Sequence, residues 1–236
     1  MKLQLACFER LGVASWRTLD AVASAARERG LLVIADGKRG DVPITAAAYA
    51  QALIGETPSH FGPLPGLGAD AITVNPLLGR DSLEPFANAA ASAGAGLFVL
   101  VRTSNPGAAE LQDAPAPDEP LHERLAVWVD ELGAGLIGAS GLSSVGAVTG
   151  ATRPDLLERL RALMPRAVFL LPGVGAQGGD PDALGPAFAP HPAAGLVTAS
   201  RSIVGAHRER GGDPGGAAAA AAEELRAAAW RASGGG

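Results

Sequence analysis

The amino-acid sequence predicts an α/β fold with a parallel sheet. Short apolar runs alternate along the chain with Ala- and Leu-rich stretches of helical spacing, and polar or glycine-rich clusters follow most of the apolar runs. Strand and helix patterns that alternate without a break are typical of right-handed βαβ units. The two folds built in this way are an open doubly wound sheet and a closed (β/α)8 TIM barrel.

Seven apolar runs each have the length of a strand that is buried on both faces. They are residues 3–8, 31–36, 70–75, 96–102, 145–150, 167–173 and 194–200. A closed barrel of this class needs eight strands. The first run begins next to Met1, so the sequence leaves two alternatives: an open sheet, or a barrel that lacks its first strand at the front of this chain.

The stretches between these runs predict helices. They cover residues 15–29, 45–54, 82–93, 121–132, 155–164 and 217–230. Ser15 is expected to cap the first helix and Gly30 to end it. Asp41 is a candidate cap for the second helix.

The segments outside these patterns predict loops. The Pro- and Gly-rich segment 62–68 and the Pro- and acid-rich segment 108–120 are expected to be loops, and the tail 233–236 is expected to be disordered.

Composition limits the class of protein. The 236 residues are 47% hydrophobic and 18% charged, which suits one domain over residues 1–236 with a sizeable core. The net charge of -5 argues against a general nucleic-acid binder, because neutralising phosphates needs clustered Lys and Arg. Cys7 is the single cysteine, so no internal disulfide can form, and its apolar neighbours predict a core position. We expect a soluble cytoplasmic protein, since no membrane-length apolar run or signal-peptide layout is present.

Polar side chains cluster where the predicted strands end, which is the face on which barrel enzymes build their active sites. The segment DGKRGD places Asp36, Lys38 and Asp41 after the second apolar run. Residues two apart on a strand face the same way, so Asp36 and Lys38 are expected to share a face. An ion pair plus a helix cap would explain these residues without catalysis. Two carboxylates and a lysine at a barrel mouth would instead form a site with shifted pKa values.

Two late glycine-rich turns predict a phosphate site. They are the PGVGAQGG run (172–179) and the SRS run (200–202). Glycines let the backbone approach a ligand closely, and the loops after the last two strands of barrels often bind phosphate. Arg201 can bind a phosphate bidentately, with Ser200 beside it, and Gln177 can close over it.

At these positions the chain resembles orotidine 5′-phosphate decarboxylases. DGKRGD is similar to the Asp-x-Lys-x-x-Asp signature of that family. The runs FERLG, TVNPLLG, DSLEPF, RTSNPG, LLPGVGAQGGD and ASRSI are similar to its longer-chain bacterial branch, called type 2. The resemblance covers most of residues 2–206. It implies a TIM barrel of the ribulose-phosphate-binding type, orotidine 5′-monophosphate as substrate, UMP and CO2 as products, and no cofactor or metal.

The resemblance also implies roles for individual residues. Lys38 would protonate C6 of the pyrimidine, Asp36 would lie beside the substrate carboxylate, and Lys2 would hold the carboxylates in place. In a homodimer, Asp41 and Thr45 would cross the interface into the neighbouring subunit's site. The remaining matches would bind the substrate: Ser104 and Pro172 at the base, and Gln177, Ser200 and Arg201 at the phosphate.

One departure from the family pattern bears on activity. The family's first strand carries an aspartate that binds the ribose, and this chain shows no such strand. A start site assigned too far downstream would explain this. Two rival functions are therefore an Mg²⁺-dependent barrel enzyme that acts on a sugar phosphate through Asp36 and Asp41, and a non-catalytic truncated barrel.

Overall fold

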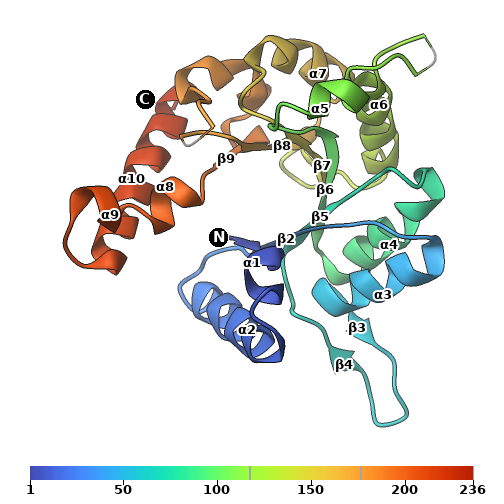
Figure 1. The fold of residues 1–236 in the computed structure, drawn as a ribbon. Coiled ribbons are helices and arrows are strands. Elements are labelled where there is room, and N and C mark those ends of the chain that lie inside the picture. The colour runs from blue at the N-terminus through green and yellow to red at the C-terminus, as the bar shows by residue number, and fades with distance from the viewer. Residues whose placement is uncertain (117, 176, 236) are drawn as a thin grey trace. The chain divides into compact units, whose positions relative to one another are not determined.

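The computed structural model describes residues 1–116, 118–175 and 177–235, and it contains one main sheet of seven strands. Their order in the sheet is β1-β2-β5-β6-β7-β8-β9, and the pairs β1–β2, β2–β5, β5–β6, β7–β8 and β8–β9 are parallel. Helices follow the strands along the chain (Figure 1). The strands are β1 (Lys2–Gln4), β2 (Ile34–Arg39), β5 (Ala71–Val74), β6 (Gly96–Arg102), β7 (Ser143–Thr149), β8 (Ala167–Pro172) and β9 (Gly195–Thr198).

Contacts between residues divide the chain into two compact units. Unit 1 comprises Met1–Leu100, Leu132–Gly138 and Ser144–Gly146, and unit 2 comprises Val101–Glu131, Ala139–Ser143 and Ala147–Gly236. The prediction of one domain over residues 1–236 stays a prediction.

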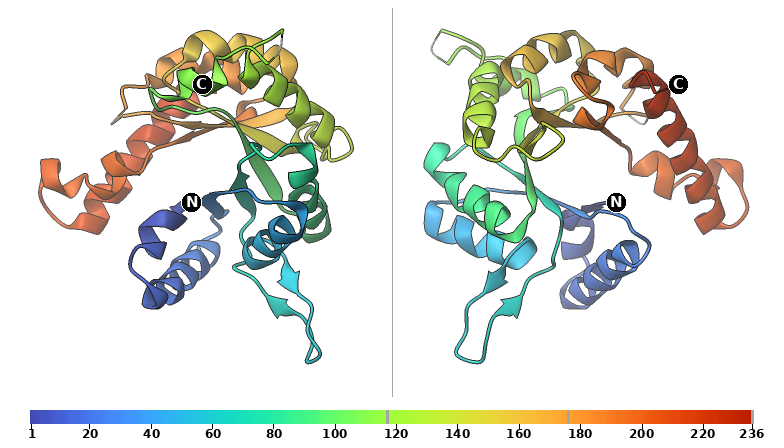
Figure 2. Two further views of the ribbon diagram at one scale, coloured as in Figure 1. Left: turned by 45° about the vertical axis from the view of Figure 1, so that its right-hand side comes forward. Right: turned by 180° about the vertical axis from the view of Figure 1, so that it is seen from behind.

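Unit 1 packs helices against strands β1, β2 and β5. Its core side chains include Leu5, Ile72, Val74 and Phe86, all fully buried. Helices α3 and α4 lie side by side (Figure 2). The helices of this unit are α1 (Leu5–Glu9), α2 (Val13–Arg27), α3 (Pro43–Leu53), the 3-10 turn η1 (Arg80–Ser82) and α4 (Glu84–Ala93).

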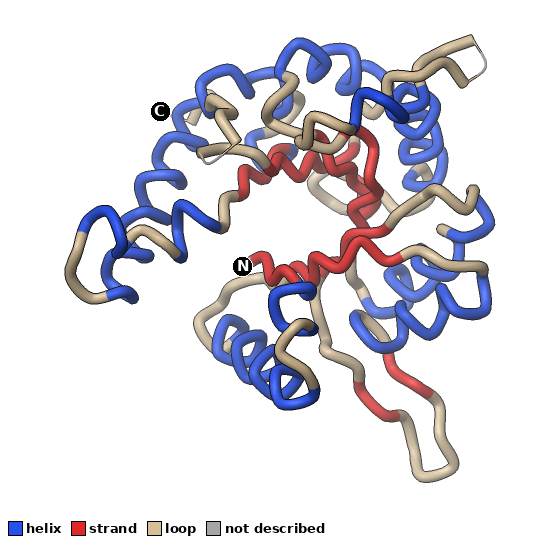
Figure 3. Tube along the Cα trace, viewed as in Figure 1, coloured by secondary structure: helices blue, strands red, loops and turns tan. Residues whose placement is uncertain are grey.

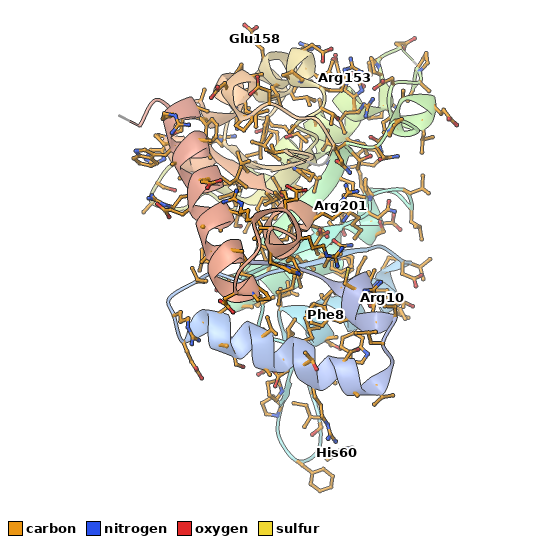
Figure 4. The ribbon with its side chains drawn as sticks, turned by 60° about the vertical axis from the view of Figure 1, so that its left-hand side comes forward. Phe8, Arg10, His60, Arg153, Glu158 and Arg201 are labelled. Carbon is orange, nitrogen blue, oxygen red and sulfur yellow. The ribbon has the colours of Figure 1, made fainter. Side chains whose placement is uncertain are left out.

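A β-hairpin projects from unit 1 beyond α3 (Figure 3). Its strands are β3 (Glu56–Thr57) and β4 (Leu64–Pro65), which pair antiparallel. His60 lies near its tip (Figure 4), next to a fully exposed Phe61. The segment 62–68, expected to be a loop, therefore supplies one strand of this hairpin, because residues 56–57 offer it a partner.

Unit 2 packs its helices against strands β8 and β9. Phe169, Leu171 and Leu184 are fully buried in it. The long C-terminal helix contacts both α8 and η3 (Figure 1). The helices are α5 (Ala108–Gln112), η2 (Pro154–Leu156), α7 (Leu157–Leu163), η3 (Pro181–Phe188), η4 (Pro192–Ala194), α8 (Arg201–Val204), α9 (His207–Arg210) and α10 (Pro214–Ala232). Helix α6 (Leu121–Gly133) contributes residues to both units.

Buried Arg161 ties several segments of unit 2 together. Its guanidinium donates to the carbonyls of Met164, Ala167, Ala187 and Ala194 and lies 3.7 Å from the ring centroid of Phe169. Burial lowers the pKa of this group to about 10. Ala167 is the first residue of β8 and Ala194 directly precedes β9, so Arg161 binds the chain where both strands begin.

The β2–β5 pair contains an irregularity at the segment that carries Asp36 and Lys38. Ala35 pairs with Ile72, but Arg39 pairs with Val74, so four steps along β2 match two steps along β5. Such a bulge bends the strand and changes the direction of its side chains. Residues 36–38 therefore lie opposite Thr73 alone.

Several local predictions are wrong near the N-terminus. The first strand ends at Gln4, because Leu5–Glu9 turn into helix α1. That turn leaves Cys7 exposed, where a core position was expected. Ser15 is not an N-cap, since α2 begins at Val13 and the Ser15 hydroxyl donates to the carbonyls of Phe8 and Gly12.

Two further predictions need correction. Asp41 does not cap α3, because Val42 occupies the N-cap and Pro43 begins the helix. The segment 108–120 is not a continuous loop, because Ala108–Gln112 form α5. In the tail, Gly234 and Gly235 donate backbone hydrogen bonds to the end of α10, and Gly236 lies outside the described residues. Among the residues described, no helix is both long and apolar enough to span a membrane.

Candidate active site

A carboxylate held between two ammonium groups forms the centre of the candidate site in unit 1. Asp36 on β2 accepts a 2.6 Å hydrogen bond from Lys2 Nζ at Oδ2 and a 2.5 Å hydrogen bond from Lys38 Nζ at Oδ1. Lys2 lies on the neighbouring strand β1, whose Gln4 pairs with Asp36. The expectation that Asp36 and Lys38 share a face is confirmed by this contact.

The two partners of Asp36 differ in their access to solvent. Asp36 is 4% exposed. The Lys2 side chain is 12% exposed and that of Lys38 is 41% exposed. Lys38 can therefore meet a ligand while its counter-ion stays buried.

Opposing influences act on the Asp36 carboxyl. Burial would raise its pKa, but the charges and hydrogen bonds of Lys2 and Lys38 together outweigh burial and hold the pKa below its usual value of 3.8. Asp36 is therefore ionised at neutral pH, and the cluster carries a net positive charge. Such an array can stabilise a developing negative charge nearby.

Thr73 on β5 completes this cluster, and the sequence alone did not single it out. Its buried Oγ1 accepts a 2.9 Å hydrogen bond from the backbone N–H of Lys38 and donates a 2.9 Å hydrogen bond to Asp36 Oδ1. Lys38 itself has φ of 49°, in the left-handed region that non-glycine residues rarely adopt. The sequence feature that could have identified Thr73 is its position in the apolar run 70–75, which is the next predicted strand after the one that leads into DGKRGD.

Asp41 and Thr45 lie near the surface of unit 1. Asp41 Oδ1 accepts a 2.8 Å hydrogen bond from the backbone N–H of Val42, and Thr45 lies in the first turns of α3. Both residues are partly exposed. Their neighbours Val42 and Ile44 are 53% and 87% exposed, so an apolar surface surrounds them.

Within unit 2, Ser104 is held by close backbone contacts. A Cβ added at Gly150 would lie 2.7 Å from Ser104 Cα and 2.8 Å from its nitrogen. Thr152 Oγ1 donates to the Ser104 carbonyl at 3.1 Å. Only glycine at position 150 lets the two loops approach this closely.

An ion-pair network supports the same loop. Buried Arg102, at the end of β6, donates twice to the carboxylate of Asp113, at 2.8 and 3.0 Å. Asp113 also contacts His122 and Arg153 at 3.1 and 3.4 Å. The pKa of Asp113 is lowered, first by the hydrogen bonds from Arg102. Next to Arg102, Gln112 Oε1 accepts from the Thr103 N–H at 2.8 Å, so residues 102–104 are anchored on both sides.

The glycine-rich run after β8 brings Ser104 and Gln177 together. Gly173 has φ of 108°, and a Cβ there would lie 3.0 Å from Gln177 Oε1 and 3.0 Å from Ser104 Cβ. The carbonyl of Pro172, the last residue of β8, accepts a 2.8 Å hydrogen bond from the backbone N–H of Ala151. Ala176 of this run lies outside the described residues.

The run is also close to the SRS run (200–202), which contains the predicted phosphate-binding residues Ser200 and Arg201. A Cβ at Gly175 would lie 3.1 Å from Ser202 Oγ. Ser200 is the N-cap of α8 and Arg201 its exposed first residue (Figure 4). Ser202 and Gly175 also line a cavity of about 250 Å³, whose other lining residues are Val174, Ala199, Ile203, Arg210, Ala221, Glu224 and Leu225.

The predicted residues therefore form two groups, one in each unit. Lys2, Asp36 and Lys38 are in direct contact in unit 1. Ser104 and Gln177 both lie close to Gly173 in unit 2, where Pro172 directly precedes Gly173 and Ser202 of the SRS run (200–202) lies close to Gly175. Sequence reasoning missed Thr73, Gly150 and Thr152, because their roles depend on which strands and loops are neighbours. Among the described residues, no group of three or more His, Cys, Asp and Glu side chains could hold a metal ion.

Comparison with known proteins decides the family. Residues 1–212 match the model of the orotidine 5′-phosphate decarboxylase / HUMPS family.

This chain belongs to that family.

Curated relatives are named orotidine 5′-phosphate decarboxylase. The orotidine 5′-phosphate decarboxylase of Rhodopirellula baltica is 46% identical over 208 residues, which cover 88% of this chain and 68% of the relative. That of Deinococcus radiodurans is 47% identical over 218 residues, covering 89% of this chain and 75% of the relative. The resemblance based on the DGKRGD and RTSNPG segments is confirmed.

Solved structures of the family share the fold. The OMP decarboxylase of Leishmania donovani has a TM-score of 0.74 and 34% identity, covering 97% of this chain and 80% of that one. The UMP synthase of the same organism has a TM-score of 0.72 and 34% identity, and this chain spans 46% of its length. The fold is a (β/α)8 TIM barrel, of which the described residues form seven strands in one sheet.

Proposed function

We propose that Lys38 is the proton donor in the orotidine 5′-phosphate decarboxylation that this chain carries out. The observation that carries the assignment is the contact of Asp36 with both Lys2 and Lys38. It holds a buried carboxylate and an accessible ammonium group within 2.5 Å of each other. Family membership supports the reaction, and this geometry supports the roles of the residues.

The reaction replaces a carboxylate by a proton. The bond between C6 of the pyrimidine and the carboxylate carbon breaks, CO2 leaves, and the electron pair remains on C6. Lys38 stabilises this carbanion electrostatically and then delivers its proton to C6, which gives UMP. Lys2 keeps Asp36 ionised and in place while the proton of Lys38 is transferred.

Asp36 would destabilise the ground state of the bound substrate. A substrate carboxylate beside it experiences like-charge repulsion, worth about 4 kcal/mol for unit charges at 4 Å and an effective dielectric of 20. Very slow reactions need ~20 kcal/mol or more from an enzyme. Repulsion therefore supplies a minor part of the catalytic free energy. Preorganised positive charge near C6 and binding energy from the phosphate must supply the rest.

Unit 2 would supply the substrate-binding groups. Ser104 and Pro172 would contact the base, and Gln177, Ser200 and Arg201 would bind the phosphate. The meeting of Ser104 and Gln177 at Gly173 supports a common site for these two residues. Arg201 is exposed at the start of α8, where its guanidinium is free to bind an anion bidentately.

We further propose a homodimer in which Asp41 and Thr45 reach the neighbouring subunit's site. The exposed apolar side chains Val42 and Ile44 beside them support an interface, because a subunit contact would bury this surface. Asp41 would then add its charge to the Lys38 of the partner subunit.

Mixing inactive variants tests both proposals. Lys38→Ala and Asp41→Ala homodimers are each expected to lose nearly all decarboxylation, measured as UMP formation. After subunit exchange, a hybrid dimer has one intact site, and random exchange of equal amounts restores about a quarter of wild-type activity. The matched control is a mixture of Lys38→Ala with Lys2→Ala, in which every site lacks one lysine and no activity returns.

Two results would count against these assignments. Substantial activity in the Lys38→Ala homodimer would remove Lys38 as proton donor. Confirmed subunit exchange without recovery in the Lys38→Ala and Asp41→Ala mixture would remove the shared site and leave the role of Lys38 untouched.

A further inference from the structure

The hydroxyl of Thr73 is placed between the two groups that define the reaction centre. Its oxygen is 2.9 Å from the backbone nitrogen of Lys38 and 2.9 Å from Asp36 Oδ1, and Thr73 is 1% exposed. All three residues belong to unit 1. The mechanism above assigns no part to this hydroxyl.

The direction of both hydrogen bonds follows from chemistry. The Lys38 N–H can only donate, so the Thr73 oxygen accepts there. An ionised carboxylate can only accept, so the single hydroxyl proton of Thr73 points to Asp36 Oδ1. The chain from peptide N–H through hydroxyl to carboxylate is fully determined, and linked hydrogen bonds of this kind strengthen one another in a buried site.

The bulge in β2 explains why a side chain is needed here. Opposite Thr73, residues 36–38 depart from regular pairing with β5. The Lys38 N–H therefore finds the Thr73 hydroxyl in place of a backbone carbonyl. A buried N–H without a partner would cost free energy, so the hydroxyl also holds Lys38 in its left-handed conformation, φ 49°.

We propose that Thr73 is a positioning residue for the decarboxylation, which fixes the backbone of Lys38 and the Oδ1 atom of Asp36 relative to each other. The inference rests on the proposed role of Lys38. The side chain of Lys38 curls back to the same Oδ1 atom that Thr73 binds, so one oxygen sets the place of the ammonium group. Thr73 acts through these two residues and needs no contact with substrate.

The β-branched side chain suits this task. Threonine has restricted rotation about χ1, so its hydroxyl is held in one direction in a strand. Serine keeps the hydroxyl but rotates more freely, whereas valine keeps the shape and loses the hydrogen bonds. Comparing the two substitutions separates the effect of the hydroxyl group from the effect of the side-chain shape.

Thr73→Val and Thr73→Ser test the proposal in steady-state decarboxylation assays. A lost hydrogen bond to a charged group corresponds to about a 10- to 100-fold loss, and we expect this loss in kcat of Thr73→Val. KM and the affinity for UMP should stay within about threefold, because the proposed binding groups lie elsewhere. Thr73→Ser should recover most of kcat.

Controls separate positioning from folding. Thr149 is also buried, and its Oγ1 has no hydrogen-bond partner among the described residues, so Thr149→Val controls for the exchange of a buried threonine in thermal unfolding. All variants are assayed well below their melting temperatures. If Thr73→Val does not fold, Thr73→Ala replaces it under the same criteria, since the smaller side chain leaves room for water at the Lys38 N–H.

Each result of these assays either supports or overturns the positioning role of Thr73. A kcat within about threefold of wild type in Thr73→Val overturns the proposal, as does a serine variant that is as slow as the valine variant. A parallel loss of kcat and UMP affinity indicates a general structural role and also overturns it. An active Lys38→Ala variant removes the proposed role of Lys38 as proton donor, which is a different result from an active Thr73→Val.

Discussion

At the residue scale, Asp36 binds three donors with one carboxylate. Lys2, Lys38 and Thr73 occupy three of its roughly four lone-pair sites. Removing the charge of Asp36 would leave the ammonium groups of Lys2 and Lys38 close together without their shared counter-ion. Asp36 is therefore expected to stabilise the fold as well as the proposed reaction. Replacing one partner of a buried ion pair also leaves the other charge unpaired, so the measured loss of stability is larger than the net contribution of the pair.

Stability should depend on pH through Asp36. Its pKa in the folded protein is lowered, so its contribution is complete above the ordinary value of 3.8 and is lost as pH falls through the lower folded pKa. We expect Asp36→Asn to lose about 3 kcal/mol of unfolding free energy at pH 7, and we expect this gap to shrink below about pH 4. Urea unfolding of both proteins at pH 7, 5, 4 and 3 measures it.

An exposed ion pair provides the control for Asp36. Asp155 pairs with Arg153 at 2.7 Å, and its side chain is 58% exposed. Asp155→Asn should change the unfolding free energy by less than about 1 kcal/mol, because solvent screens the pair. A gap for Asp36→Asn that persists unchanged to pH 3 would contradict the linkage argument.

At the scale of elements, close backbone contacts position the loops of unit 2. Gly150 follows β7 and lies against Ser104, which follows β6, while Gly173 follows β8 and lies against both Ser104 and Gln177. These glycines stand directly after strands, where the loops of a parallel sheet converge. The loops pack through their backbones, so small residues at these positions determine where the predicted substrate-binding side chains lie.

Gly150→Ala should impair catalysis by moving Ser104. The added methyl group would lie 2.7 Å from Ser104 Cα, which is backbone and must shift. A displacement of about 1 Å at a substrate-positioning residue can cost up to 100-fold, and we expect kcat/KM to fall at least tenfold. Steady-state kinetics measure it.

Gly135→Ala is the matched control for Gly150→Ala. A Cβ at Gly135 meets nothing within 4 Å, so alanine is expected to leave kcat/KM unchanged. Equal kinetics for the two variants would show that the contact between the loops does not position Ser104.

At the scale of the whole molecule, the predicted residues are divided between two compact units of one family fold. Lys2, Asp36 and Lys38 belong to unit 1, whereas Ser104, Gln177 and Arg201 belong to unit 2. The reaction chemistry and the binding of the phosphate are thus proposed for different parts of the chain. Variants in unit 1 should mainly change kcat, and variants in the loops of unit 2 should also change KM.

EDTA should leave turnover unchanged. The ammonium groups of Lys2 and Lys38 already neutralise Asp36, and with Thr73 they leave its oxygens little room for an Mg²⁺ ion. The measurement is initial rate with and without EDTA, followed by added Mg²⁺. Loss of activity with EDTA and its return with Mg²⁺ would favour the rival sugar-phosphate chemistry.

The sequence by itself determined the places along the chain of the seven strands of the main sheet, the family, and the place of the charged cluster. Apolar runs and the DGKRGD, RTSNPG and PGVGAQGG segments are local patterns, so they can be read without tertiary contacts. The wrong predictions were local as well: the early end of β1, the exposed Cys7, the caps expected at Ser15 and Asp41, and the loops expected at 62–68 and 108–120.

Only the tertiary structure decided which residues from different strands and loops meet. The bulge opposite Thr73, the hydroxyl shared by Lys38 and Asp36, and the contact of Gly150 with Ser104 all join segments more than 30 residues apart. The physical reason is that strand register and loop approach depend on how neighbouring elements pack, and no local pattern in the chain encodes that packing.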